Sequence, residues 1–177
     1  MTTDHSQLLI GGVWTAPATG NRITVRSAST EEVIGSVPEA STADVDEAVA
    51  AARRAFEDPT GWSTWDPARR AEVLGRLAEE YEKRSEPIYA AVSSQNGMPI
   101  AIARQLESFP PLLFRYYADL IRKQPAEEVR DGLLASTVTV RRSAVGVVAA
   151  IIPWNVPQSL TASKLGPGLA AGCTLVV

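Results

Sequence analysis

Asn155 is the residue whose type and position best suit chemistry in this sequence. It closes a Pro153-Trp154-Asn155 turn that interrupts a run of β-branched and small apolar residues. Its neutral side-chain amide can donate a hydrogen bond without titrating, and a fixed N–H donor at a strand end is what a developing oxyanion requires. The alternative is structural, because asparagine beside proline in a turn commonly satisfies local backbone groups.

Three further side chains could take part in chemistry. Cys173, the single cysteine, enters an apolar strand with no basic residue beside it, which predicts a buried structural thiol rather than a nucleophile. Lys164 lies in a largely apolar helical stretch, so it has either a buried partner or an ammonium group at the surface. His5, the single histidine, lies in an N-terminus expected to be loose, which excludes a His-based triad and disfavours a zinc site.

The pattern around the turn predicts one βαβ unit. Residues 146–152 suit a buried strand, residues 157–171 have helical spacing with Gly172 as a stop, and residues 174–177 begin a second buried strand. Ligands of open parallel sheets bind at the carboxyl ends of the strands, where the turn would lie. No G-x-G-x-x-G follows any strand, so the standard dinucleotide fingerprint is absent.

The first half of the chain predicts short strands and then helices. Strands are expected at 8–15, with a Gly-Gly turn, and at 23–26 and 33–37. A helix capped by Ser41, with Asp44 in its first turn, should bury one face. That face comprises Val45, Ala48, Val49, Ala52, Ala55 and Phe56.

A second helix should start at Asp66-Pro67. We expect it to bury Val73, Leu74, Leu77 and Tyr81 and to expose its charges, from Arg69 to Arg84, as a solvated face. Trp62 and Trp65, which precede it, are expected to anchor the core rather than to form a stacking platform.

The middle of the chain continues with helices and one strand. A helix at 85–95, with Ile88, Ala91 and Val92 inward, should stop at Asn96-Gly97, and a helical pattern at 100–123 should kink or split at Pro110-Pro111. Residues 124–132 suggest a polar connection, and 136–142 an exposed strand. Arg141 and Arg142 would protect this edge, or alternatively bind a phosphate.

Composition favours a globular domain. The chain has 177 residues, 45% hydrophobic and 21% charged, with a net charge of −3 that gives no reason to expect nucleic acid. Neither a secretory leader nor an apolar run of membrane-spanning length is present, so no membrane contact is expected. A single cysteine excludes an internal disulfide and suggests the cytoplasm.

The strings IIPWNVP and SKLGPGLAAGCTLVV, in that order, resemble the aldehyde dehydrogenase family. The upstream strings SQNGMP, FRYYA and STVTVRR are similar to family segments too, although Met98 replaces a lysine and Ser143-Ala144 replace Glu-Pro. The resemblance implies an α/β fold: the N-terminal part of the aldehyde dehydrogenase fold, with the first strands of a Rossmann-like parallel sheet. Residues 12–177 would form this part after an extension at 1–11, with an oligomerisation-arm strand at 136–142 and the start of the NAD(P)-binding unit at 145–177.

The resemblance also implies a site. Asn155 would donate to a thiohemiacetal oxyanion, Lys164 could join a proton relay, and NAD or NADP would be lined by Ile151, Ile152, Pro153, Trp154 and Asn155. The family's nucleophilic cysteine and its glutamate base come later than Val177, so the 177 residues alone should be inactive on an aldehyde. A homo-oligomer is expected of the full-length form. A non-catalytic assembly module and an acyl-CoA-forming enzyme are the alternatives.

Overall fold

The computed structural model describes residues 3–177 and contains small sheets and six α-helices, labelled in chain order. The strands are β1 (Thr3–Asp4), β2 (Leu8–Ile10), β3 (Val13–Thr15), β4 (Arg22–Arg26), β5 (Val33–Pro38), β6 (Glu127–Asp131), β7 (Thr137–Arg141), β8 (Val147–Ala149) and β9 (Thr174–Val176). The helices are α1 (Thr42–Glu57), α2 (Pro67–Lys83), α3 (Ser85–Asn96), α4 (Ile100–Leu106), α5 (Phe109–Lys123) and α6 (Pro157–Ala171), with short 3-10 turns at Trp62–Thr64 and Leu133–Ala135.

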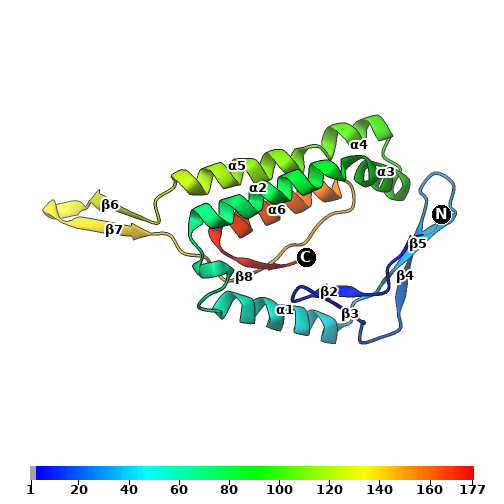
Figure 1. Ribbon diagram of the computed structural model, residues 1–177, viewed down its shortest axis with the longest axis horizontal. Helices are drawn as coiled ribbons and strands as arrows, with labels where there is room; N and C mark the ends of the chain where they lie inside the picture. Colours follow the sequence, from blue (N-terminus) through cyan, green and yellow to red (C-terminus); the bar gives the residue numbers. More distant parts are fainter. Residues whose placement is uncertain (1–2) are drawn as a thin grey trace.

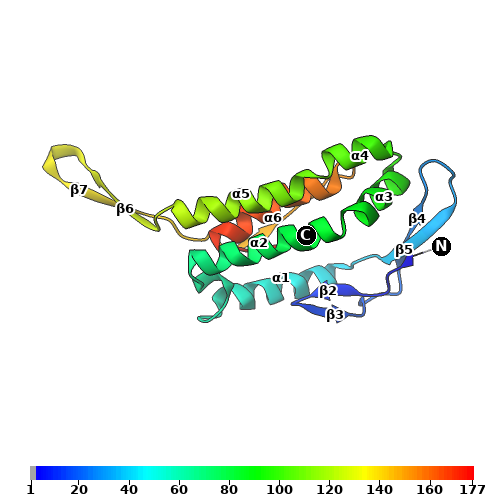
Figure 2. The same cartoon turned by 45° about the horizontal axis from the view of Figure 1, so that its top comes forward.

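Helices α2, α5 and α6 lie side by side and form the main core (Figure 1; Figure 2). The buried side chains between them are mostly small: Ala71, Leu74, Ala78, Phe114, Ala118, Ala162 and Ala170. Alanine and glycine let helix backbones approach closely. A Cβ atom added at Gly166 of α6 would lie 2.7 Å from the Tyr117 ring of α5, so close packing of the two helices favours glycine at this position.

The predicted βαβ unit is confirmed. Strands β8 and β9 pair in parallel, from Val147 opposite Thr174 to Ala149 opposite Val176, and α6 connects them. Helix α6 covers one face, where Gly168 meets Leu175, and α1 covers the other, where the Thr174 hydroxyl donates to the Ala52 carbonyl at 2.9 Å. The expected strand at 146–152 is too long, because pairing ends where the Ala150 N–H donates to the Val176 carbonyl and no described strand accompanies residues 151–153.

The N-terminal residues are tied into sheets. Strand β1 pairs in parallel with β5, which pairs with β4, and β2 with β3 form a hairpin over Gly11-Gly12. The His5 N–H donates to the Ser36 carbonyl at 2.9 Å. The expectation of a loose N-terminus is therefore wrong for the paired residues, which gain backbone hydrogen bonds from β5.

Helix α1 begins as predicted and packs less deeply than predicted. Ser41 and Asp44 form a reciprocal capping box, and Asp44 also accepts from the Ala18 N–H at 2.9 Å. These hydrogen bonds lower the pKa of Asp44. Val45 and Val49 are 47% and 43% exposed, whereas the small Ala51, on the side of α1 that faces Gly11, is buried.

Helix α3 ends at Gly97, which adopts the left-handed conformation (φ 78°). Its buried face consists of Tyr89 and Val92, whereas Ala91, expected inward, is exposed. The helical pattern at 100–123 is split as predicted into α4 and α5, with Glu107 and Ser108 between them. Because proline lacks the backbone donor of a helix interior, Pro110 and Pro111 fit only the first turn of a new helix.

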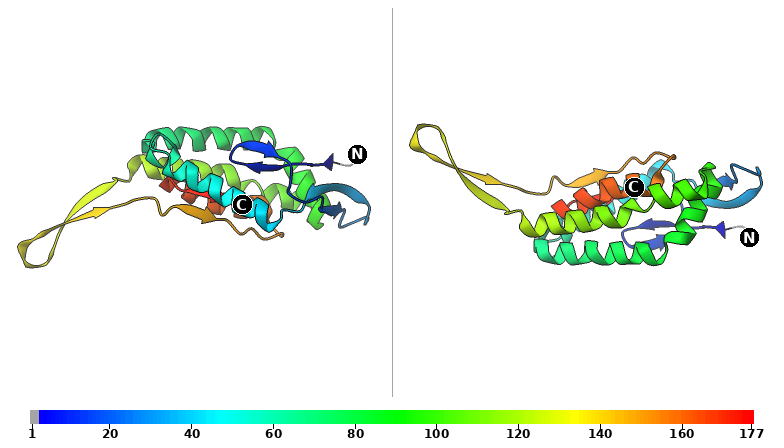
Figure 3. Two further views of the ribbon diagram at one scale, coloured as in Figure 1. Left: turned by 90° about the horizontal axis from the view of Figure 1, so that it is seen from below. Right: turned by 90° about the horizontal axis from the view of Figure 1, so that it is seen from above.

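The hairpin β6–β7 projects from the end of the helical layer (Figure 1; Figure 3). The expected polar connection at 124–132 is wrong, because Glu127–Asp131 pairs antiparallel with β7. Arg141 donates to Glu127 at 2.6 Å and Arg142 to Glu128 at 2.9 Å, so both cations pair across the hairpin. This pairing supports their structural interpretation over phosphate binding.

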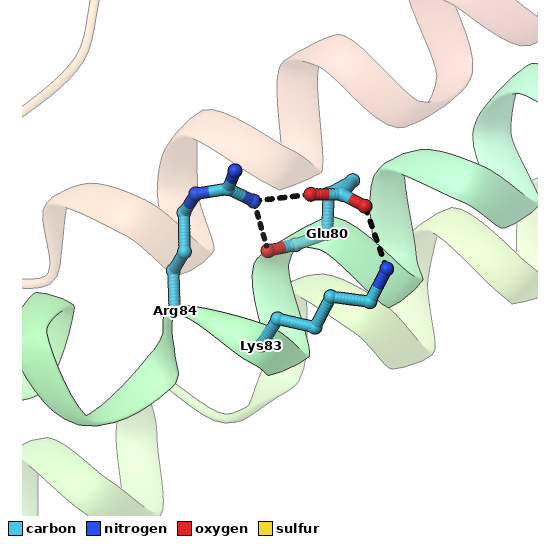
Figure 4. A network of polar contacts seen from close by, with 3 residues as sticks. All are labelled: Glu80, Lys83 and Arg84. Atoms are coloured by element: carbon cyan, nitrogen blue, oxygen red, sulfur yellow. Dashed lines mark hydrogen bonds and ion pairs between the residues drawn. The ribbon is translucent and has the colours of Figure 1, made fainter.

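The predicted charged face of α2 contains one exception, Arg70. Most of the charges are solvated, as at Glu80, which pairs with Lys83 and Arg84 (Figure 4). Arg70 is only 9% exposed and donates to the carbonyls of Ala170, at 3.1 Å, and Trp65. Trp62 is anchored on α6 as expected, because its indole N–H donates to the Leu169 carbonyl at 3.2 Å.

Candidate functional site

The turn after β8 lies at the carboxyl end of the parallel pair, where sheet ligands bind. Ile151 is 88% exposed and Trp154 78% exposed, while Ile152 is half-buried and Pro153 and Asn155 are exposed. The structure therefore brings the five predicted site residues together on one surface segment. Two large apolar side chains of this segment face solvent.

The backbone of the turn is held from outside the turn. The Asn96 side-chain amide donates to the carbonyl of Asn155 at 3.1 Å and to that of Trp154 at 3.3 Å. The Asn96 side-chain oxygen accepts from the Met98 N–H at 2.9 Å, which fixes the orientation of the amide. Among residues 3–177 the Asn155 side chain has no hydrogen-bond partner, so the backbone-satisfying role expected of a turn asparagine belongs to Asn96.

The first turn of α6 is capped by a distant carboxylate. Val156 at the N-cap offers no side-chain acceptor, but Glu107 accepts from the Ser159 N–H at 2.8 Å and from the Gln158 N–H at 3.4 Å. The Ser159 hydroxyl in turn donates to the Leu106 carbonyl at 2.5 Å. Sequence reasoning missed Glu107, although a single acid among apolar residues in QLESFPPLL was a usable signal.

Glu107 is also fixed from α2. The Tyr81 hydroxyl donates to the Glu107 backbone carbonyl at 2.8 Å. Burial raises the pKa of Tyr81, and the negative charge of Glu107 raises it further, so the phenol remains a donor at neutral pH. Contacts from α2, from the end of α3 and from the break between α4 and α5 thus meet at the start of α6, beside the turn that carries Asn155.

The other candidate residues lie apart from the turn. Lys164 is exposed on α6 and therefore needs no buried partner for its charge. Cys173 is 2% exposed, as predicted for a structural thiol. A basic group lies nearby, because a Cβ atom added at the preceding Gly172 would be 3.5 Å from the guanidinium carbon of Arg70. Burial lowers the pKa of Arg70, and the charge of Asp66 opposes that shift.

The turn suits one end of a dinucleotide better than the other. Exposed Ile151 and Trp154 offer an apolar surface that a flat ring such as nicotinamide could cover. In the standard dinucleotide fold the diphosphate binds the N–H groups at the helix start, but here Glu107 already accepts from those groups. At this βαβ turn, two N–H groups at the start of α6 are therefore already bonded to Glu107, while the side chains of Ile151 and Trp154 stay exposed.

One further surface feature does not involve the turn. A groove of about 700 Å³ lies between α1, the β2–β3 hairpin and β9, and residues 151–155 do not line it. In the described part of the chain, no helix combines the length and apolar character needed to cross a bilayer. Within 3–177, no three or more His, Cys, Asp or Glu side chains gather as a metal site would require.

Comparisons with known proteins relate this turn and fold to one enzyme family. A sequence model described as the aldehyde dehydrogenase family matches residues 14–177. Geranial dehydrogenase of Castellaniella defragrans is 48% identical over the whole chain, and aminoaldehyde dehydrogenase 2 of Zea mays is 35% identical over 99% of it. The chain spans 37% and 36% of the lengths of these two relatives.

Solved structures agree with the sequence matches. The aldehyde dehydrogenase of Mycobacterium tuberculosis, complexed with NAD+, matches 99% of this chain with a TM-score of 0.92 and 37% identity, over 36% of its own length. An aldehyde dehydrogenase C variant of Pseudomonas syringae, complexed with NAD+ and octanal, matches 96% of the chain with a TM-score of 0.88 and 37% identity, over 34% of its own length. On the extent of the family match and the agreement of the fold, the chain belongs to the aldehyde dehydrogenase family.

Proposed function

We propose that this chain is the N-terminal part of an NAD(P)-dependent enzyme that oxidises an aldehyde to a carboxylic acid. The observation that carries the proposal is the Asn155 amide, which is exposed at the carboxyl end of β8 while other residues hold its backbone. In the overall reaction, aldehyde, NAD(P)+ and water give acid, NAD(P)H and a proton. The family match supports the reaction class.

Asn155 acts when a cysteine from the remainder of the enzyme attacks the aldehyde carbon. The carbonyl oxygen gains negative charge as the thiohemiacetal forms, and the Asn155 amide donates to it. Because this charge is small in the bound aldehyde, the donor stabilises mainly the transition state. Bound NAD or NADP supplies the hydride acceptor, and Ile151, Ile152, Pro153 and Trp154 would form the surface against its nicotinamide end. Lys164 remains a candidate for a proton relay.

Oligomerisation through the projecting hairpin is part of the proposal. Leu133 and Leu134 at the tip are 89% and 100% exposed, and Val129 of β6 is 70% exposed. Apolar side chains at the end of such an arm favour contact with another subunit, so we infer a homo-oligomer of the full-length form. The same hairpin favours the second candidate, a non-catalytic module that assembles with full-length relatives.

The free thiol of Cys173 suits a reducing compartment, and we place the enzyme in the cytoplasm.

The test uses the full-length enzyme that carries this chain. NAD(P)H formation is followed with geranial, octanal and betaine aldehyde, three aldehydes that the names of similar proteins suggest. Formation of the free acid without coenzyme A supports the proposal, whereas a requirement for coenzyme A identifies the acyl-CoA-forming alternative. The 177-residue chain alone should be inactive. Turnover by that chain, abolished in Cys173→Ser, would contradict both the proposal and the structural role of Cys173.

A further inference from the structure

Glu107 is a buried carboxylate with an unusual set of partners. Its side chain is 0% exposed, and among residues 3–177 no Lys or Arg forms an ion pair with it. Burying an unpaired carboxylate is costly unless hydrogen bonds compensate. Here the compensation comes from the backbone N–H groups of Gln158 and Ser159, at the positive end of the α6 dipole.

The break between α4 and α5 makes this contact possible. Pro110 and Pro111 prevent one continuous helix, so the chain turns at Glu107 and Ser108. Glu107 is the C-cap of α4, with its N–H bonded to the Ala103 carbonyl at 2.8 Å. Its backbone carbonyl accepts from Tyr81, and its side chain reaches α6. The backbone of Glu107 is therefore held by α2 and α4, while its carboxylate contacts α6.

The contact lies in the first turn of α6, close to Asn155 in the sequence. Ser159 follows Asn155 by four positions, and the segment between them contains no side chain that caps α6. Asn96 fixes the carbonyl of Asn155 from the other direction. The turn at residues 153–155 is thus held by hydrogen bonds on two sides: from Asn96 at the end of α3, and through α6 from Glu107 at the α4–α5 break. If the start of α6 shifts, the Asn155 amide shifts with it.

We propose that Glu107 is a positioning residue for Asn155, acting through the first turn of α6. The inference rests on the proposed function, because it assigns Glu107 to the same oxyanion site. Glu107 touches no reacting atom. Its role is to set where the Asn155 amide points when the oxygen becomes charged.

The experiment is a double-mutant cycle in the full-length enzyme. Glu107→Gln keeps the side-chain size and one acceptor but brings an NH₂ group against a backbone N–H, and Glu107→Ala removes both acceptors. Asp44→Asn is the matched control, because Asp44 is a buried carboxylate (7% exposed) that caps α1 instead of α6. Each variant is made in the parent and in Asn155→Ala, and kcat, aldehyde KM, NAD affinity and Tm are measured.

Misplacement of a catalytic group by about 1 Å can cost on the order of 100-fold in rate, so we expect Glu107→Gln to lower kcat roughly 10- to 100-fold. NAD affinity should change less than about 3-fold, because residues 151–154 keep their side chains. In the Asn155→Ala background the further loss of kcat should fall below about 3-fold, because the donor that Glu107 positions is gone. Asp44→Asn should lower Tm and leave kcat within about 2-fold.

Equal losses of kcat in both backgrounds would overturn the proposal, because they would show an effect independent of Asn155. Unchanged kcat in Glu107→Gln would do the same. Amide hydrogen exchange of the full-length protein gives a measurement that does not depend on activity. The Ser159 N–H should exchange faster in Glu107→Gln, and its exchange rate should be unchanged in Asp44→Asn. If the parent oxidises no aldehyde, the proposed function fails. Faster exchange confined to the start of α6 would then still show that Glu107 holds the first turn of this helix. Unchanged exchange would show that it does not.

Discussion

The side-chain amide of Asn96 donates to the backbone carbonyl of Asn155 at 3.1 Å, although the two residues are 59 positions apart. This bond changes the interpretation of a turn asparagine. An asparagine in a Pro-Trp-Asn turn would be expected to satisfy the backbone of the turn itself, but here a second asparagine, from the end of α3, does so. The Asn155 amide therefore remains available for a substrate oxygen.

Replacing Asn96 should impair the same step as replacing Asn155, but less severely. Asn96→Asp keeps the acceptor for the Met98 N–H and removes the donors to the turn, at a cost of about 0.5–1.5 kcal/mol of stability for a hydrogen bond. We expect roughly a 10-fold lower kcat, because a loosened turn misplaces the donor. Steady-state kinetics with Asn21→Asp, at an exposed asparagine next to β4, provide the control. A variant with wild-type kcat and lower Tm would assign Asn96 to stability alone.

Asn155→Ala should remove a transition-state hydrogen bond. Loss of one such donor costs about 2.7–4 kcal/mol, or roughly 100- to 1000-fold in kcat. NAD binding should change by less than about 1 kcal/mol, because Trp154 and Ile152 are unaltered. Kinetics and NAD titration of the full-length enzyme separate the two effects. Collapse of NAD affinity with nearly normal kcat would make Asn155 a structural residue.

Arg70→Met should destabilise the fold. The substitution leaves the carbonyls of Ala170 and Trp65 without their donor in a buried place, and hydrogen bonds from charged groups contribute about 1.5–3 kcal/mol. Thermal unfolding of the full-length enzyme should show a lower Tm. Arg76→Met on the exposed face of the same helix should leave Tm nearly unchanged. Equal shifts for both variants would show that the buried bonds contribute little.

Glu80 should titrate far below an ordinary glutamate. Hydrogen bonds from Lys83 and Arg84, together with their positive charges, lower the pKa of Glu80 to about 2 (Figure 4). A depressed folded-state pKa stabilises the fold above the unfolded value of 4.5, and this contribution is lost as the pH falls toward 2. Carboxyl NMR should show the low pKa, and Lys83→Met with Arg84→Met should return it toward 4.5. An unchanged pKa in that double variant would contradict the assignment.

The 177-residue chain without a continuation should self-associate. Strand β9 pairs only with β8 among the described strands, and the groove beside it is lined by apolar residues of α1 and β2. An unpaired apolar strand edge recruits further strands, so sedimentation should show oligomers or aggregate. Val177→Lys, at a residue that is 71% exposed, should reduce association by adding charge to the edge. A sharp monomer with strong amide protection in 146–152 and 174–177 would refute this expectation.

Local rules determined much of the fold from the sequence alone. Proline at the start and a left-handed Gly172 at the end define α6, Asn96-Gly97 ends α3, and Ser41 with Asp44 caps α1. Each of these signals acts on backbone groups within a few residues of it, so it can be recognised from the sequence without a structure. The βαβ order then placed 151–155 at a strand end.

Tertiary structure decided which polar groups are buried and what they hold. Glu107 meets Ser159 across 52 positions and Arg70 meets Ala170 across 100, so neither contact leaves a local pattern in the sequence. Strand β6 likewise forms from a polar stretch by pairing its backbone with β7, and Arg141 and Arg142 then pair with its glutamates. The sequence determined the turn that presents Asn155, because turn chemistry is local. The groups that hold this turn in place, Asn96 and Glu107, became visible only when packing brought distant helices to it.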